Sequence, residues 1–444
     1  MATVPPDPDL ELLTASLATG RLAGLVRALR GELAACLAGA PDAEALPDDC
    51  MLPAYAGALP TGAETGTYVA VDVGGSTVRV AVVQLAAGVC TVVHAAAAAI
   101  TDGVRSLDGR SFFIWLASQL QSALTDAEGA GWVPPAVIPL GLAWSFPLEQ
   151  AAVDSGTILT MGKGFGDMSA EMAGWDIKTV FVRACMDLDL TVDLRAVVND
   201  TVSTVLAAAY ADPRAQLALV LGTGFNAAAV VRAPGRPPAV INSELSKFSR
   251  RPGVLPATRW DAALDAASDA PGFQPLEQMV AGRYLGEIAR RVLVDLVAGG
   301  HACGGRLPAG LGTPFGLESA TMAAVEAAGD AEGARQQFLA RHACRGLTAG
   351  HMAVVRAVFR AVASRAAALV AAALVALAET AGLAGADAPV VVVAATGAVV
   401  EQYPGFRGQC QQFLDLLGRG SVRLVLRPAP QAALCGPAVA AAAN

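Results

Sequence analysis

The chain has 444 residues, enough for two domains, and its formal net charge of −8 comes without a basic stripe. An acidic chain of this kind argues against nucleic acid as a partner. Hydrophobic residues make up 54% of the sequence, but the longest uncharged helical run, residues 366–378, is shorter than the roughly 20 residues that a membrane span needs. We therefore expect neither a nucleic acid partner nor insertion into a membrane.

The beginning of the chain, MATVPPDPDL, lacks the basic and apolar regions of a secretory signal. The 8 cysteines are scattered singly, without a CxxC motif, and the 4 histidines form no ligand pair at helical spacing. We predict that the cysteines are reduced, mostly buried thiols in a cytoplasmic protein. We also predict no structural zinc site.

The first half of the chain contains the first of two glycine turns. Residues 1–40 alternate Leu and Ala with polar positions, which predicts amphipathic helix interrupted at glycines, and a Pro- and Gly-rich connector follows. Residues 66–83, GTYVAVDVGGSTVRVAVV, place a glycine-rich turn between two apolar runs and predict two strands, which residues 91–100 extend into a sheet. The other predicted elements are a helix at 111–124, a strand that leaves into a loop at 136–150, and a strand, turn and helix at 193–212.

The second half repeats the device of strand, glycine turn and strand at residues 217–231, LALVLGTGFNAAAVV. The chain then becomes mostly helical after Phe273. The last predicted elements are helices at 276–297 and 353–383, a buried strand at 388–400, and a strand, loop and Ala-rich helix at 423–444. Strands that alternate with helices predict an α/β fold, and the two glycine turns suggest two similar lobes around a cleft.

Neither glycine turn has the Walker pattern GxxxxGK[ST] or the GxGxxG fingerprint of dinucleotide sites. Taken alone, each turn is more simply explained as a structural hairpin. A glycine-rich turn between antiparallel strands also presents backbone N–H groups to phosphate oxygens, and glycine lets a ligand approach the backbone. The presence of Asp72 before one turn and Asn226 after the other keeps both interpretations open.

The sequence Asn199-Asp200-Thr201 lies where an apolar run meets a predicted helix. All three residue types cap helices well, so an N-cap is one interpretation. A carboxylate at the end of a strand is also where an α/β enzyme places a general base.

A resemblance decides between these interpretations. Motifs along most of the chain are similar, in family order, to those of the fungal and animal hexokinases, which have the two-lobed actin-like ATPase (ribonuclease H-like) fold with a cleft between a small and a large domain. The motifs are DVGGSTVRV at 72–80, LGLAWSFPLEQ at 140–150, SGTILTMGKGF at 155–165, VVNDTVSTVLA at 197–207, LGTGFNAAAV at 221–230, INSELSKF at 241–248 and LEQMVAGRYLGEIARRVL at 276–293. With this resemblance the phosphate interpretation of both turns is favoured over the hairpin.

The resemblance implies a role for each matching residue. Asp200 matches the catalytic base that takes a proton from the sugar 6-hydroxyl, in a phosphoryl transfer that mostly needs positioning and charge neutralisation. The residues that match the ATP-phosphate and Mg²⁺ side are Asp72, Gly74, Gly75, Ser76, Thr77 and Arg79. The second phosphate turn is matched by Gly222, Thr223 and Gly224. The sugar-binding set, which Asp200 joins, is matched by Ser145, Lys163, Asn199, Asn226, Glu244 and Glu277.

The resemblance also implies the domains and partners. We predict an N-terminal helical segment and connector at 1–66 that packs on the large domain, a small domain at 67–210 and a large domain at 211–444. The expected partners are a small-molecule sugar and ATP, with Mg²⁺ carried by ATP and no metal site of the protein itself. The protein is expected to be a monomer or a homodimer.

Departures from the family pattern gather on the sugar side. Gly162 stands where the family has threonine, Leu245-Ser246 stands where it has Trp-Gly, and the aromatic residue before Ser145 is Trp144. Loss of bulk beside the catalytic aspartate predicts a sugar larger than glucose, with N-acetylglucosamine as the best candidate. The same segments resemble those of the hexokinase-related N-acetylglucosamine kinases of fungi. The alternative is drift that leaves a glucose or hexose specificity intact.

The adenosine side departs from the pattern as well. The family's DGS is replaced by residues 396–398, Thr-Gly-Ala, and its closing polar loop is replaced by residues 431–434, Gln-Ala-Ala-Leu. These changes favour a second alternative, a hexokinase-like sugar-sensing regulator with weak catalysis. Retention of Asp72, Arg79 and Asp200 argues against it.

Overall fold

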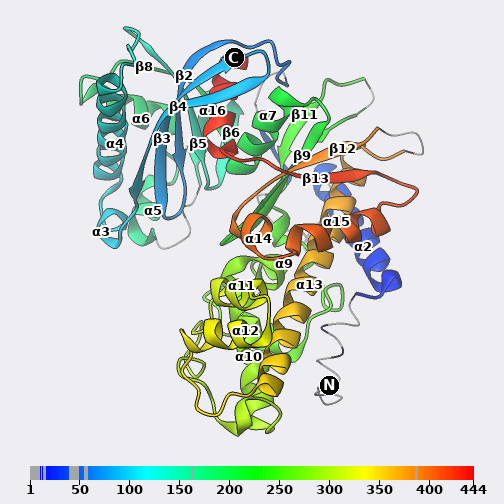
Figure 1. Cartoon of the computed structure of the whole chain (residues 1–444). Helices are drawn as coiled ribbons and strands as arrows, with labels where there is room; N and C mark the ends of the chain where they lie inside the picture. The colour runs from blue at the N-terminus through cyan, green and yellow to red at the C-terminus, as the bar shows by residue number, and fades with distance from the viewer. Residues whose placement is uncertain are drawn as a thin grey trace.

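The computed structural model describes Glu11, Leu13 and residues 17–39, 50–54, 59–159, 161, 165–233, 235–385 and 389–444. Within these residues the strands form a five-stranded sheet, a six-stranded sheet and a two-stranded ribbon. Figure 1 shows the two larger sheets side by side in the upper part of the molecule, with a group of helices below the six-stranded sheet.

The five-stranded sheet has the strand order β4-β3-β2-β5-β8. Its strands are β2 (Gly66–Val73), β3 (Thr77–Ala86), β4 (Val89–Ala99), β5 (Ile138–Trp144) and β8 (Val192–Val198). β3 pairs antiparallel with β2 and β4, whereas β2, β5 and β8 are parallel. The Val-, Leu- and Ala-rich strand β5 is buried almost throughout, as expected of a parallel strand covered on both faces, while the edge strand β4 alternates between exposed and half-buried residues.

The six-stranded sheet has the order β1-β11-β10-β9-β12-β13. Its strands are β1 (Leu52–Ala54), β9 (Ala215–Leu221), β10 (Phe225–Val231), β11 (Ala239–Asn242), β12 (Val391–Thr396) and β13 (Leu424–Pro428). β9 and β10 form the second hairpin, and β12 lies parallel to β9. The ribbon consists of β6 (Leu148–Ala152) and β7 (Ser155–Ile158).

Helices connect and cover the sheets. They are α2 (Thr19–Leu37), α3 (Asp102–Arg105), α4 (Gly109–Gly129), α5 (Gly166–Met172), α6 (Ile177–Met186), α7 (Asp200–Ala211), α8 (Arg259–Ala266), α9 (Pro275–Val280), α10 (Gly282–Ala298), α11 (Ser319–Ala327), α12 (Ala331–Leu339), α13 (Ala349–Thr380), α14 (Ala398–Gln402), α15 (Phe406–Leu417) and α16 (Ala432–Ala443). α4 and α6 cover one face of the five-stranded sheet, and α16 covers the other.

α7 and α16 also form the contact between the two sheets, since α7 packs on β9 and α16 packs on α7. Two glycines permit this close packing. A Cβ at Gly141 of β5 would lie 2.0 Å from the carbonyl oxygen of Pro437, and a Cβ at Gly436 would lie 2.1 Å from that of Ser203. Any side chain at either position would therefore push α16 away from the first sheet or from α7.

α13 is the core helix of the second lobe. In the part of the chain that the structure describes, it alone is long and apolar enough to span a membrane, but 89% of that apolar window is buried inside the protein. It also carries Arg365, whose fully buried guanidinium donates two hydrogen bonds of 2.7 Å to Asp261. Burial alone would raise the pKa of Asp261, but Arg365 and Thr258 outweigh burial and hold it below its ordinary value.

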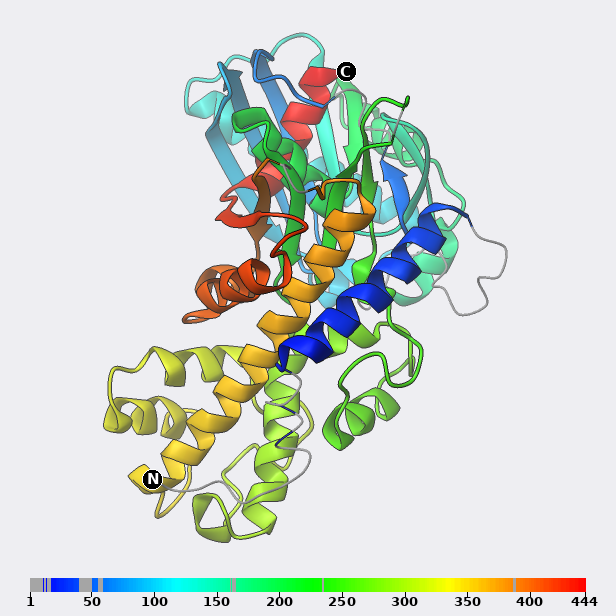
Figure 2. The ribbon, with the colours of Figure 1, turned by 90° about the vertical axis from the view of Figure 1, so that its right-hand side faces the viewer.

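These observations confirm the predicted α/β fold with two lobes, and both predicted glycine-turn hairpins. The helix predicted over residues 1–40 corresponds in the described residues to α2, which packs on α13 and α15 (Figure 2). α2 continues through Gly24 and Gly31 without a break, so the predicted interruption at glycines is wrong there. The domain boundaries near residues 66 and 210 stay a prediction. The C-terminal helix α16, although far away in the sequence, lies on the first sheet.

The prediction of reduced cysteines is wrong for four of them. The structure has disulfides between Cys36 and Cys50 and between Cys90 and Cys435. The remaining cysteines are free thiols: Cys185, Cys303 and Cys410 are buried, and Cys344 is half-buried. Cys90 and Cys435 are 345 positions apart, so the sequence pattern did not reveal that they form a pair. They meet because α16 packs beside β4. The cytoplasmic location stays a prediction.

Candidate active site

The candidate site lies where β2, β5 and β8 end. Because these strands are parallel and Val73, Trp144 and Val198 lie close to one line across the sheet, the residues that follow them meet at one edge. The backbone N–H of Ser145 donates to the carbonyl oxygen of Val73 at 3.1 Å, which joins the predicted sugar loop to the first glycine turn. Asn199 begins the next connection along the same edge.

The first glycine turn closes with a hydrogen bond of 3.0 Å from the N–H of Gly74 to the carbonyl oxygen of Thr77. The φ of Gly74 lies outside the left-handed region, so glycine is not needed there for its backbone angle. A Cβ would instead lie 3.2 Å from the oxygen of Thr77. Ser76 at the tip is exposed. Arg105 of α3, which the sequence analysis missed, donates to the carbonyl oxygen of Gly75 at 3.0 Å.

At the start of α7, the structure separates the two interpretations of Asn199 and Asp200. The side chain of Asn199 accepts hydrogen bonds from the backbone N–H and the hydroxyl of Thr201, at 2.9 and 2.6 Å, and so caps the helix. Asp200 is the first helical residue and is half-buried. Since Asn199 is the cap, capping does not explain the carboxylate of Asp200.

A cluster of two amides and one carboxylate lies on the side of the second sheet that faces α7. Asn226 donates from Nδ2 to Asn242 Oδ1 at 2.8 Å and to Glu244 Oε1 at 3.3 Å, and Asn242 donates to the same Glu244 oxygen at 2.9 Å. The hydroxyl of Thr201 reaches Asn242 Oδ1 at 3.3 Å, so the cluster continues to the residue after Asp200. Such alternating donors and acceptors suit a polyhydroxylated ligand.

Asn242 and Thr201 were not among the predicted site residues. Both stand inside motifs that the sequence analysis quoted, two residues before Glu244 and one after Asp200. Their positions inside these motifs were a signal that could have identified both residues. The hydrogen bond between them could be seen only in the structure.

The second glycine turn is held from the side of α9 and α10. The N–H groups of Gly282 and Arg283 donate to the carbonyl oxygens of Gly222 and Thr223, at 2.8 and 3.2 Å. The carboxylate of Glu277 accepts a hydrogen bond of 3.0 Å from the N–H of Phe225. Glu277, predicted for the sugar, therefore contacts the second phosphate turn in this structure.

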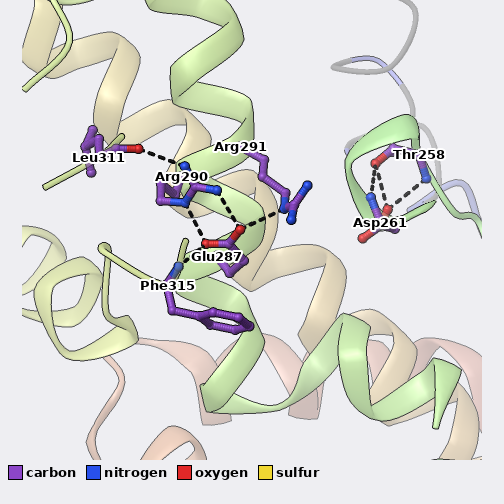
Figure 3. Close-up of polar contacts among 7 residues, drawn as sticks. All are labelled: Thr258, Asp261, Glu287, Arg290, Arg291, Leu311 and Phe315. Carbon is purple, nitrogen blue, oxygen red and sulfur yellow. Dashed lines mark hydrogen bonds and ion pairs between the residues drawn. The ribbon is translucent and has the colours of Figure 1, made fainter. Parts of the chain in front are cut away.

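Figure 3 shows how α10 is fixed beyond this turn. The fully buried carboxylate of Glu287 accepts hydrogen bonds from Arg290, Arg291 and the N–H of Phe315. Arg290 also donates to the carbonyl oxygen of Leu311 at 2.7 Å. Burial would raise the pKa of Glu287, but its hydrogen bonds and the two arginines outweigh burial and lower it. The cluster anchors the loop that follows α10.

The positions that depart from the family pattern occupy different environments. Leu245 is fully buried, and Trp144 is fully buried with its ring near those of Phe113 and Phe146, at 6.1 and 5.3 Å between centroids. Both side chains thus belong to apolar cores. Gly162 and Lys163 lie outside the described residues.

The loop after β12 remains well anchored despite its altered sequence. A Cβ at Gly397 would lie 2.4 Å from the carbonyl oxygen of Leu221, so the chain approaches the second glycine turn closely there. Glu401 accepts hydrogen bonds from the hydroxyl of Thr396 and the N–H of Gly397, at 2.8 and 3.1 Å. At the start of α16, the carbonyl oxygen of Ala432 accepts a hydrogen bond of 2.9 Å from the Ser203 hydroxyl of α7.

Two sheets joined through α7 and α16, each with a glycine turn at the end of a central strand, define a two-lobed protein of the actin-like ATPase class. In the described residues no three His, Cys, Asp or Glu side chains gather as a metal site.

Comparison with known proteins narrows this class. Two hexokinase family models match the chain, over residues 12–210 and 216–443. Hexokinase-1 of Oryza sativa subsp. japonica is 32% identical over 452 residues, covering 96% of this chain and 88% of the rice protein. The hexokinase of Schwanniomyces occidentalis is 27% identical over 414 residues, covering 88% of this chain and 84% of the relative. The structure of the Schistosoma mansoni hexokinase complexed with glucose matches with a TM-score of 0.83 and 25% identity, over 98% of this chain and 99% of that one.

The chain belongs to the hexokinase family, as its motifs predicted. It is an ATP-dependent sugar kinase.

Proposed function

We propose that this kinase transfers the γ-phosphoryl group of ATP to the 6-hydroxyl of a hexose, with Asp200 as the general base. The supporting observation is the position of Asp200. It follows β8 at the edge where the first glycine turn lies, and its neighbour Thr201 contacts the cluster of Asn226, Asn242 and Glu244. A carboxylate between a phosphate-binding turn and a set of sugar-binding amides is what this transfer needs.

The proposed roles divide between the two lobes. The first glycine turn, with Asp72 and Arg79, binds the phosphates and the Mg²⁺ that the nucleotide carries. The second glycine turn binds the phosphates from the opposite lobe. Asn226, Asn242 and Glu244 hold the sugar hydroxyls, so that the 6-hydroxyl lies beside Asp200. The carboxylate accepts the hydroxyl proton as the new phosphorus–oxygen bond forms and the bond to the ADP oxygen breaks.

For the sugar itself, we propose glucose or a closely similar hexose as the first candidate. The hexokinase of Schistosoma mansoni, whose structure matches over nearly the whole chain, is complexed with glucose. Of the positions where bulk differs from the family, Leu245 and Trp144 are fully buried, so their side chains shape apolar cores. N-acetylglucosamine is the second candidate, favoured by Gly162 in place of the family threonine.

The test is ADP release by the purified chain with Mg-ATP and glucose, N-acetylglucosamine or no sugar. Glucose-dependent release supports the first candidate, and faster release with N-acetylglucosamine supports the second. No release with either sugar, from a folded sample that still binds one of them, would favour the sugar-sensing regulator and contradict the proposed kinase activity.

A further inference from the structure

The segment from Asn242 to Ser249 carries two residues of the sugar-side cluster, Asn242 and Glu244, and has an unusual backbone. Glu244 and Ser249 have φ angles of 51° and 67°, in the left-handed region that residues other than glycine rarely adopt. Such conformations persist only where the surrounding structure holds them. What holds this segment therefore also fixes the carboxylate of Glu244 relative to Asn226 and Asn242.

One support comes from the N-terminal helix α2, which no motif of the sequence singled out. The side chain of Glu32 is buried, and its Oε2 accepts a hydrogen bond of 2.8 Å from the backbone N–H of Ser249. This bond satisfies a buried donor at one of the left-handed residues, the last residue of the segment. Without the carboxylate, that N–H would be buried with no acceptor from α2.

A second support joins the same helix to the other end of the segment. Cys36 lies four positions after Glu32, on the same face of α2, and forms a disulfide with Cys50. The next residue, Met51, donates its N–H to the carbonyl oxygen of Ser243 at 3.1 Å, and β1 continues with Leu52 opposite Asn242. One face of α2 thus holds the segment both before and after Glu244.

The helix is itself anchored to the core of its lobe. α2 packs along α13, as Figure 2 shows, and Arg30 forms an ion pair of 3.0 Å with Glu379 at the end of that helix. Movement of the segment 242–249 would therefore require movement of α2 against the long core helix.

We propose that α2 is a clamp, in the sense that it holds the sugar-binding segment 242–249 in place. Glu32 is the positioning residue through which the helix sets the affinity of the protein for sugar. This inference rests on the proposed function, which assigns Glu244 to the sugar. Glu32 does not touch the substrate. It acts through the backbone of Ser249, so it affects sugar binding and leaves the nucleotide side unchanged.

The experiment compares three variants in the full chain. Glu32→Leu removes the acceptor, Glu32→Gln keeps an acceptor oxygen without the charge, and Arg27→Ala, at an exposed position of the same helix, is the matched control. We expect Glu32→Leu to raise the KM for the sugar by about five- to thirty-fold, with the KM for Mg-ATP within about two-fold of wild type. Glu32→Gln and Arg27→Ala should stay near wild type. An unchanged sugar KM in folded Glu32→Leu, or an equal rise in both KM values, would overturn the clamp.

If Glu32→Leu does not fold, Cys50→Ser tests the other attachment, with a smaller rise in sugar KM expected and an unchanged KM contradicting the clamp. Failure of the proposed function is distinguishable, because the wild-type chain would then turn over no sugar. Hydrogen exchange of the amides in 243–249 would still test the clamp. Faster exchange in Glu32→Leu than in Glu32→Gln supports it, and equal exchange contradicts it.

Discussion

Arg79 donates a hydrogen bond of 2.9 Å to Asp72 across the first glycine turn, between residues that lie directly opposite each other in the β2–β3 register. Asp72 is only 3% exposed, whereas the side chain of Arg79 is half-exposed. The arginine thus orients a buried carboxylate at the base of the turn that we assign to the nucleotide.

From this pair we expect Arg79→Ala to weaken the handling of Mg-ATP. Loss of a charged hydrogen-bond partner from a buried carboxylate costs about 1–3 kcal/mol, so kcat/KM for Mg-ATP should fall by about ten- to a hundred-fold. Steady-state kinetics with varied nucleotide measures the effect. Sugar binding, followed by isothermal titration, serves as the control and should be unchanged, and a loss confined to sugar binding would contradict the assignment.

The second prediction concerns Asp200. Replacement by alanine should lower kcat by about 10²- to 10⁴-fold, which is the usual contribution of a general base. Sugar binding should be largely kept. Because Asn199 rather than Asp200 caps α7, the variant should fold with a melting temperature near that of wild type. Asp200→Asn, of nearly the same shape, should be equally slow. Turnover retained in either variant would show that the base lies elsewhere.

Much of this architecture follows from local sequence pattern. The hairpins at 66–83 and 217–231 could be predicted because the glycine turn and both flanking strands are contiguous in the chain. The contact of Thr201 with Asn242 could not, since it joins elements 41 positions apart through a fold that pattern does not specify. The same holds for Arg105 on Gly75 and for the Cys90–Cys435 disulfide.

The third prediction tests Asn242, which structure rather than pattern brought into the site. Asn242 accepts from Asn226 and Thr201 and donates to Glu244, so Asn242→Leu leaves three polar partners short of a hydrogen bond. We expect the KM for the sugar to rise by about ten-fold or more, at a cost of about 1–3 kcal/mol, with little change in the KM for Mg-ATP. Ser243→Ala, one residue along, is the matched control, since its hydroxyl bonds the backbone of Ala227 instead. Equal sugar KM values for the two variants would remove Asn242 from the site.

The fourth prediction concerns the choice of sugar and rests on sequence, because Gly162 lies outside the described residues. Gly162→Thr restores the family residue and adds a whole hydroxyethyl side chain, CH(OH)CH3. If N-acetylglucosamine is used at all, the ratio of kcat/KM for glucose over N-acetylglucosamine should rise by about ten-fold, the usual effect of one small group in a pocket. Competition between the two sugars in one assay measures the ratio directly. An unchanged ratio would mean that this position does not decide the sugar.

The last prediction concerns acid stability. Glu287 and Asp261 have pKa values held below their ordinary values of 4.5 and 3.8 by buried arginines. A carboxyl group whose pKa is lower in the folded state stabilises that state fully above its ordinary pKa, and loses this effect as the pH falls through the folded-state pKa. The contribution of these two carboxylates to the free energy of unfolding should therefore not change with pH near neutrality. It should fall steadily below about pH 4.5.

Urea unfolding at a series of pH values measures this dependence, and Glu287→Gln isolates one contribution. The amide leaves Arg290 and Arg291 without their buried counter-charge, so the variant should lose about 3 kcal/mol at pH 7. Because the same contribution is already lost in acid in the wild type, the difference between the two proteins should shrink as the pH falls below 4.5. Glu332→Gln, at an exposed pair with Arg335, is the control and should follow the wild type throughout. A difference that stays constant with pH would show that Glu287 stabilises the fold by its shape rather than by its charge.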